Sequence, residues 1–77
     1  MSEIRAPIPG IFYSRPSPEE EPFVEVGSNI NPETIVGLVE VMKSFHKVPA
    51  QVSGKVISID VENEGMVRAG DVLMKVE

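Results

Sequence analysis

The chain has 77 residues, no cysteine and a formal net charge of -5, with 12 acidic against 7 basic side chains. A chain this short forms one small domain that buries only about 60% of its unfolded surface, so a deep catalytic pocket would use core that it can hardly spare. The lack of cysteine excludes disulfides and thiolate metal sites, and the acidic balance disfavours binding to nucleic acid or to an anionic membrane surface.

The amino-terminal segment lacks the apolar core of a signal peptide, and no apolar run approaches the roughly 20 residues that a membrane-spanning helix needs. The absence of cysteine also fits a reducing compartment. We therefore expect a soluble, cytoplasmic protein without a membrane partner.

Four short runs of mainly β-branched and other apolar residues predict strands. In chain order they are residues 23–26, 35–39, 55–61 and 72–76. Glycine and proline lie between the runs, and no window keeps a 3.6-residue apolar period long enough for a confident helix. This pattern is typical of a small all-β sandwich or barrel. His46, the single histidine, has no partner for catalysis or metal binding, and we expect an ordinary strand residue.

The two halves of the chain are related in sequence. Residues 6–12 match residues 50–56 at an offset of 44, and residues 34–40 match residues 71–77 at an offset of 37. The difference of 7 means that the first half holds seven extra residues, for which the polar, proline-rich residues 14–20 are the candidate. Two similar halves predict two interlocked sheets related by a pseudo-twofold axis.

Met42 and Lys43 lie at the junction of the halves, so we expect their turn at one end of the molecule and both termini at the other. A lysine in a strand-to-strand turn is held in water, where another protein can reach its amine. This placement suits a lysine that is modified; the simpler alternative is an ordinary surface lysine beside a core methionine. Glu40 and Glu77 are equivalent in the repeat, which indicates matching structural positions and not a paired acid–base site.

The junction segment Glu40-Val41-Met42-Lys43 resembles the attachment motif of biotin carboxyl carrier domains, with Lys43 on the lysine that receives biotin. The flanking residues 31–35 and 50–56 are similar to those that the family has at these places. The chain departs from the common pattern at Val41, where alanine is frequent, and at Ser44, where a large apolar residue is frequent. The resemblance implies that Glu40, Val41, Met42 and Ser44 form the turn that a ligase recognises. Met42 is expected to be a recognition element, because it is flexible and apolar in an exposed setting.

Residues 12–18, followed by residues 22–27, resemble the thumb of bacterial acetyl-CoA carboxylase carrier subunits. The thumb accounts for the seven extra residues, which are Ser14, Arg15, Pro16, Ser17, Pro18, Glu19 and Glu20. Prolines in and after this insertion restrict its freedom, and Tyr13 and Phe23 could anchor it to the body of the domain. The resemblance covers essentially the whole chain, so residues 1–77 are expected to form one biotinyl/lipoyl-attachment domain.

The resemblance implies a flattened β-barrel, or barrel-sandwich hybrid, of two four-stranded antiparallel sheets with pseudo-twofold symmetry. It also implies biotin joined covalently to Lys43 by a biotin protein ligase. Such a carrier is not a catalyst: it moves a carboxyl group from a biotin carboxylase to a carboxyltransferase, here expected in acetyl-CoA carboxylase and fatty acid synthesis. The ligase, the carboxylase and the transferase are therefore the expected partners.

Three alternatives stay open at this point. The carrier could serve a propionyl-CoA, pyruvate or urea carboxylase, because these carriers resemble one another. It could carry lipoate, although lipoyl motifs usually have aspartate before the lysine, where this chain has Met42. It could also be an unmodified hybrid-sandwich adaptor domain in which the Met-Lys turn is accidental.

Overall fold

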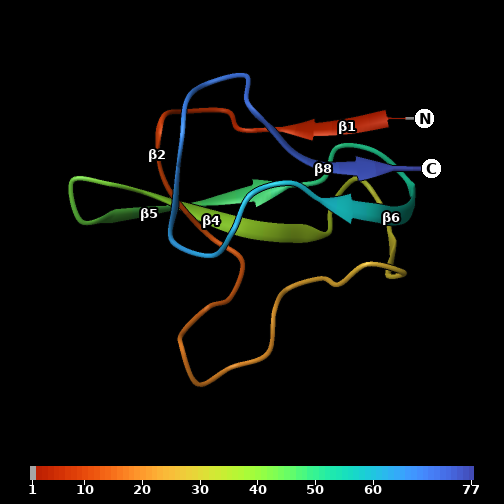
Figure 1. Ribbon diagram of the computed structural model, residues 1–77, viewed down its shortest axis with the longest axis horizontal. Coiled ribbons are helices and arrows are strands. Elements are labelled where there is room, and N and C mark those ends of the chain that lie inside the picture. The colour runs from red at the N-terminus through yellow and green to blue at the C-terminus, as the bar shows by residue number, and fades with distance from the viewer. Residues whose placement is uncertain (1) are drawn as a thin grey trace.

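The computed structural model describes residues 2–77, which form eight strands and no helix. The strands are β1 (Ser2–Arg5), β2 (Gly10–Tyr13), β3 (Asn29–Ile30), β4 (Ile35–Val41), β5 (Ser44–Pro49), β6 (Gly54–Ile59), β7 (Gly65–Val67) and β8 (Val72–Val76). They build two antiparallel four-stranded sheets, ordered β1-β8-β6-β3 and β5-β4-β2-β7. The predicted all-β class with two four-stranded sheets is confirmed (Figure 1).

The two sheets enclose one apolar core, because alternate residues of each strand turn toward the opposite sheet. Phe12 on β2 and Leu73 on β8 are among the largest side chains that lose all contact with water. The other buried hydrophobic residues are Ile4, Ala6, Val24, Ile30, Val36, Val39, Val48, Ala50, Val56, Val67, Met74 and Val76. Residues 2–77 include no helix of the length and apolarity that crossing a bilayer requires.

The backbone hydrogen bonds follow the sequence repeat. The amide of Ala6 donates to the carbonyl of Asp71 at 2.8 Å, and the amide of Ala50 donates to the carbonyl of Thr34 at 2.8 Å. The two donors are 44 residues apart and the two acceptors 37, which are the offsets found in the sequence. The two halves therefore occupy equivalent places around a pseudo-twofold axis, as the repeat predicts.

Two glycines mark the same axis. A Cβ atom added to Gly10 would lie 2.4 Å from the carbonyl oxygen of Glu40, and one added to Gly54 would lie 2.2 Å from that of Glu77. Glycine at both positions lets strand β2 approach β4, and β6 approach the end of β8, more closely than any side chain allows. Glu40 and Glu77 thus take matching structural positions, as expected from the repeat.

The predicted strand at residues 23–26 is wrong. The amide of Ser28 donates to the carbonyl of Glu25 at 2.9 Å, and the Ser28 hydroxyl accepts from the Glu25 amide at 2.9 Å. These bonds form a turn of residues 25–28, so the backbone bends at the end of the segment and does not pair along a neighbouring strand. Its apolar residue Val24 is buried nevertheless, which explains why the sequence pattern resembled a strand.

The β4–β5 hairpin reaches away from the rest of the domain at one end of the molecule (Figure 1). The chain ends lie side by side at the opposite end, where Ser2 on β1 pairs with Val76 on β8. The predicted separation of the Met42-Lys43 turn from both termini is therefore confirmed. This arrangement leaves the hairpin turn accessible from several directions.

Candidate functional site

The turn of the β4–β5 hairpin has an unusual backbone conformation. Val41 pairs with Ser44, so the loop contains only Met42 and Lys43. Their φ angles are 49° and 69°, in the left-handed region that two-residue hairpin loops need but that asparagine and glycine normally occupy. Holding side chains other than glycine there costs roughly 1–2 kcal/mol per residue. Such strain at an exposed turn points to a function for the two side chains.

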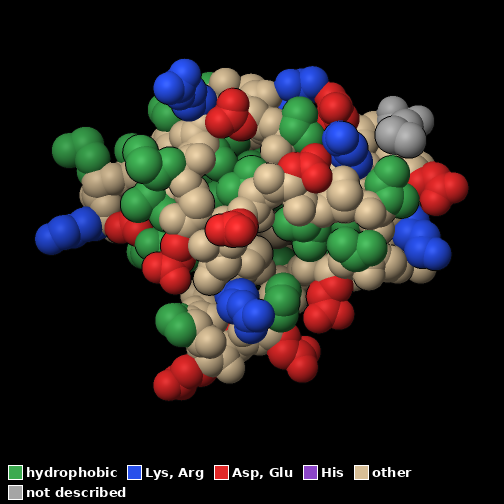
Figure 2. Space-filling view, viewed as in Figure 1, with side chains coloured by type: hydrophobic (Ala, Val, Ile, Leu, Met, Phe, Trp, Pro, Cys, Tyr) green, Lys and Arg blue, Asp and Glu red, His purple; other side chains and the backbone are tan. Residues whose placement is uncertain are grey.

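The turn is also the most exposed part of the hairpin. Met42 is 94% exposed, and every residue from Met42 to Lys47 is exposed. An apolar side chain in open water contributes nothing to the core, so the alternative of a core methionine is wrong. Figure 2 shows hydrophobic and basic side chains standing out together at the end of the molecule that the hairpin forms.

Glu40 connects the hairpin to strand β2. The Tyr13 hydroxyl donates a hydrogen bond to Glu40 Oε1 at 2.7 Å. The rings of Tyr13 and Phe45 also pack together, with centroids 5.7 Å apart and planes tilted by 55°. Glu40 and Phe45 are paired across β4 and β5, so these three side chains join neighbouring strands on the outer face of the sheet just below the turn.

The hydrogen bond to Glu40 is the main reason why the pKa of Tyr13 lies above its ordinary value, with further contributions from burial and from the charges of Glu40 and Glu64. A raised pKa in the folded chain means that this interaction stabilises the fold below about pH 10 and is lost as the pH rises through the folded-state value. Tyr13 is the single tyrosine, so its phenolate absorbance can be titrated alone.

We expect the titration midpoint of Tyr13 to fall toward about 10 when Glu40 is replaced, as Glu40→Gln removes the charged acceptor. Glu33→Gln, in the turn before β4, removes the same charge elsewhere and should leave the midpoint where it is. Equal midpoints in the parent chain and Glu40→Gln would contradict the assigned hydrogen bond.

The predicted thumb, residues 14–20, is an irregular loop whose backbone is tied at several points. The Phe23 amide donates to the Ser14 carbonyl at 2.9 Å and closes its base. Within it, the Glu20 amide donates to the Ser17 carbonyl at 3.2 Å, and Arg15 Nη1 donates to the Glu20 carbonyl at 3.0 Å. The Ser14 amide donates to Asn63 Oδ1 at 2.9 Å, which joins the base to the second half of the chain. These bonds argue against a floppy insertion.

The thumb and the hairpin face each other across a hollow of about 330 Å³. Tyr13 and Phe45 form its wall on the side of the sheet. The remaining lining residues are Arg15, Pro16, Ser17, Pro18, Asn63 and Glu64. We call this space the thumb–hairpin hollow.

The structure thus brings the predicted turn residues together and sets the predicted thumb beside them. Sequence reasoning missed Phe45 and Asn63, which line the hollow, and the bond between Tyr13 and Glu40. The aromatic pair could have been suspected because Phe45 follows the turn by two residues, but the pairing of β2 with β4 was needed to place Tyr13. Among residues 2–77, no group of histidine and acidic side chains is arranged as a metal site.

Comparison with protein families gives a match over nearly the whole chain. Residues 2–76 match the biotin and lipoyl family that is described as biotin-requiring enzyme. Curated relatives include the biotin carboxyl carrier proteins of acetyl-CoA carboxylase from Pyropia yezoensis, 39% identical over 74 residues, and from Nostoc sp., 39% identical over 77 residues. The protein of the same description from Pseudomonas aeruginosa is 43% identical over 60 residues.

These alignments cover 96%, 100% and 78% of this chain but only 47%, 42% and 38% of the relatives. The chain therefore spans less than half the length of these curated relatives. Among solved structures, the urea carboxylase of Kluyveromyces lactis matches 99% of this chain with a TM-score of 0.78 and 29% identity, using 6% of its own length. The fold described above is thus similar to a small part of a large carboxylase.

Proposed function

Since this chain belongs to the biotin and lipoyl family described as biotin-requiring enzyme, we propose that it is a biotin carboxyl carrier module with biotin attached to Lys43. The observation that carries this proposal is the strained, exposed Met42-Lys43 turn at the end of the hairpin. The curated relatives are named as carriers of acetyl-CoA carboxylase, which supports the proposal that this module serves the same enzyme. We propose one domain over residues 1–77, with residues 14–20 as its thumb.

The chemistry of Lys43 fits covalent attachment of a carboxylic acid. The Nζ amine can attack an activated biotinyl carbonyl, form an amide bond and release the activating group with the electrons of the broken bond. An ammonium has no lone pair, so the ligase must first take a proton from Lys43. The exposure of the turn lets a ligase enclose Lys43 without unfolding the hairpin.

We propose that the ligase recognises the turn and the residues beside it. Met42 offers an apolar side chain that is 94% exposed, and Ser44 adds no bulk after the lysine. Val41 is half-buried and packs against the core, and Glu40 is held by Tyr13, so both fix the direction of the turn. A fixed turn lowers the ordering cost of binding to the ligase.

When bound, biotin would supply the atom to which the carboxyl group is attached as it moves between two active sites. The chain itself contributes a rigid body, a projecting hairpin and a single attachment point, which keep the group at high local concentration near its partners. Biotin carboxylase, carboxyltransferase and the biotin ligase are therefore the proposed partners. No catalytic step is assigned to the side chains of this module.

The thumb is proposed to limit where the group on Lys43 can lie. Phe45 follows Lys43 by two residues, roughly 7 Å along the strand, so a group on Lys43 can reach the thumb–hairpin hollow. We expect deletion of residues 14–20 to keep the fold but to change the rate of carboxyl transfer or the mobility of bound biotin. Circular dichroism would report the fold, and steady-state kinetics with fluorescence anisotropy of a labelled biotin analogue would report the rest. Unchanged kinetics and mobility would refute this role.

The acceptor is tested by competition. The biotinylated chain, a biotin carboxylase and bicarbonate with ATP are combined with carboxyltransferases specific for acetyl-CoA, propionyl-CoA, pyruvate or urea. The proposal predicts that the acetyl-CoA system has the highest kcat/KM for this carrier. A higher kcat/KM with any of the other three would move the carrier to that enzyme. Modification by a lipoyl ligase in place of a biotin ligase would refute the proposal altogether.

A further inference from the structure

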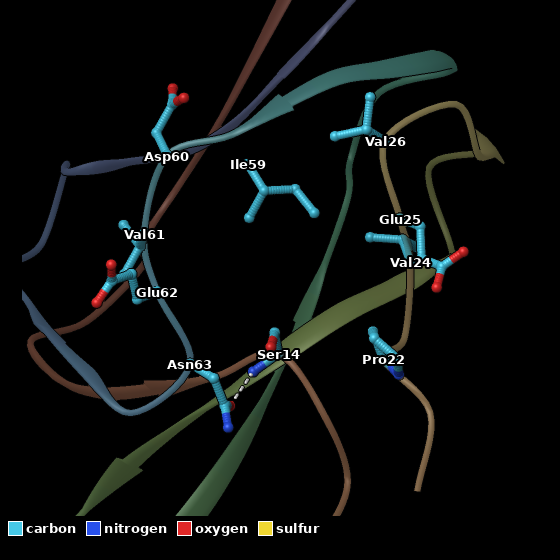
Figure 3. A pocket seen from close by; sticks show the side chains of 10 residues that line it. All are labelled: Ser14, Pro22, Val24, Glu25, Val26, Ile59, Asp60, Val61, Glu62 and Asn63. Atoms are coloured by element: carbon cyan, nitrogen blue, oxygen red, sulfur yellow. Dashed lines mark hydrogen bonds between the residues drawn. The ribbon is translucent and has the colours of Figure 1, made fainter.

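A hollow larger than the thumb–hairpin hollow lies away from the hairpin turn, and the function proposed above does not use it. It is an open groove of about 820 Å³ between residues 22–26, which return from the thumb, and residues 59–63, which are the end of β6 and the connection that follows it. Ser14 lies at one end, where its amide bonds to Asn63 (Figure 3). We call this hollow the axial groove, because its walls come from equivalent segments of the two halves.

The repeat explains why the two walls match. Val24 and Glu25 on one wall are 37 residues before Val61 and Glu62 on the other, which is the offset of the second repeat pair. The equivalence extends to the backbone, because the Ser28 amide donates to the Glu25 carbonyl as the Gly65 amide does to that of Glu62. A valine followed by an acid therefore stands on both sides of the pseudo-twofold axis.

The groove has an apolar interior. In Figure 3 the side chains of Ile59 and Val26 project into the hollow from the two walls, whereas Val24, which also lines it, is buried in the core. Val26 is 63% exposed, so its side chain is available to a partner. Pro22 and Val61 complete the apolar lining. The groove thus offers a partner a small concave apolar surface.

The edge of the groove is acidic and carries no compensating charge. The carboxylates of Glu25, Asp60 and Glu62 stand around it, and none of the residues that line the groove is a lysine or arginine. None of the three forms an ion pair within residues 2–77. Three like charges around one apolar hollow repel one another, and a cationic partner would relieve this repulsion.

We propose that the axial groove binds an extended segment of a partner protein in which an apolar side chain is flanked by arginine or lysine. The apolar side chain would cover Ile59 and Val26, and the cations would meet the acidic edge. The groove is too open to enclose most of a small molecule, as a ligand pocket does, so a polypeptide segment fits it better. Nucleic acid and anionic lipid carry the same charge as the edge and are repelled.

The test is an NMR titration of the unmodified, isotope-labelled chain with a short synthetic peptide that has two central leucines flanked by arginines. We expect shifts of the backbone signals of residues 22–26 and 59–63. The variant Glu25→Gln/Asp60→Asn/Glu62→Gln should weaken binding by about fivefold or more, as three rim charges are lost. The matched variant Glu3→Gln/Glu33→Gln/Glu77→Gln loses the same charge elsewhere and should bind within about twofold of the parent.

A peptide with serine in place of leucine should bind more weakly than the leucine peptide, and one with glutamate in place of arginine should not bind. The proposal is overturned if the leucine peptide does not bind, if its shifts lie outside the axial groove, if the serine peptide binds as well, or if both triple variants weaken binding equally. The titration needs no biotin, so its failure would leave the proposed carrier function untouched, and failure of biotinylation would leave the groove untouched.

Discussion

Replacing Lys43 by arginine is expected to abolish biotinylation and, with it, all carboxyl transfer through this module. Arginine keeps the positive charge and nearly the length of the side chain, but its guanidinium does not lose a proton in proteins and cannot act as the nucleophile. The left-handed turn and the pairing of Val41 with Ser44 should persist, because neither depends on the amine. Radiolabelled bicarbonate fixed on the carrier measures the loss directly.

Lys47→Arg is the matched control. Lys47 is exposed on β5 of the same hairpin, four residues from Lys43, and is paired opposite Leu38. We expect its replacement to leave both biotinylation and carboxyl transfer at the level of the parent chain. Residual transfer by Lys43→Arg, or a loss in Lys47→Arg, would show that the attachment point has been assigned to the wrong lysine.

The second large effect concerns the fold. Gly10→Ala should destabilise the domain by about 3 kcal/mol or more, because the new Cβ would lie 2.4 Å from the Glu40 carbonyl oxygen and 2.8 Å from Val39 Cγ1. A backbone oxygen in a paired strand cannot move aside as the end of a flexible side chain can. Since a domain of this size has roughly 4–12 kcal/mol of stability in all, a large share would be lost.

Gly70→Ala provides the comparison for this prediction. Gly70 also has a positive φ angle, 90°, but a Cβ added there meets nothing within 4 Å. Its replacement should therefore cost only the backbone strain, about 1–2 kcal/mol. Urea unfolding followed by circular dichroism measures both variants. A smaller loss for Gly10→Ala than for Gly70→Ala would show that the close approach of β2 and β4 is not as described.

Much of this fold could be predicted because the repeat is visible in the sequence. The offsets of 44 and 37 relate the halves, and the hydrogen bonds of Ala6 and Ala50 follow them. The apolar runs that became β4, β6 and β8 were also recognised, since their inward-facing residues build the core. The turn at Met42 and Lys43 followed from its place between the halves.

Other features depend on contacts that a linear pattern does not contain. Strand β5 was not among the predicted apolar runs, because it is an edge strand whose first four residues are exposed and largely polar. Strands β3 and β7 have only two and three residues, too few for a period to be seen. The left-handed turn was not predicted either, since Met42 and Lys43 lack the asparagine and glycine that signal it.

The residues that line the two hollows also could not be predicted from a linear pattern. Strand β4 lies between β5, which carries Phe45, and β2, to which the thumb is connected. Phe45 and the thumb come together only because of this strand order. The axial groove arises because residues 22–26 are irregular and lead into a turn, where the alternation predicted a strand. Both spaces are results of tertiary packing, so the residues that line them could not be grouped from the sequence.

Attachment of biotin to Lys43 is tested by the mass of the intact chain after incubation with biotin, ATP and a biotin protein ligase, followed by peptide mapping. We expect a single added biotinyl group, located on Lys43, and no addition when a lipoyl ligase with lipoate is used in parallel. No addition under conditions that fully modify an established carrier domain, or a biotinyl group on any other lysine, would contradict it.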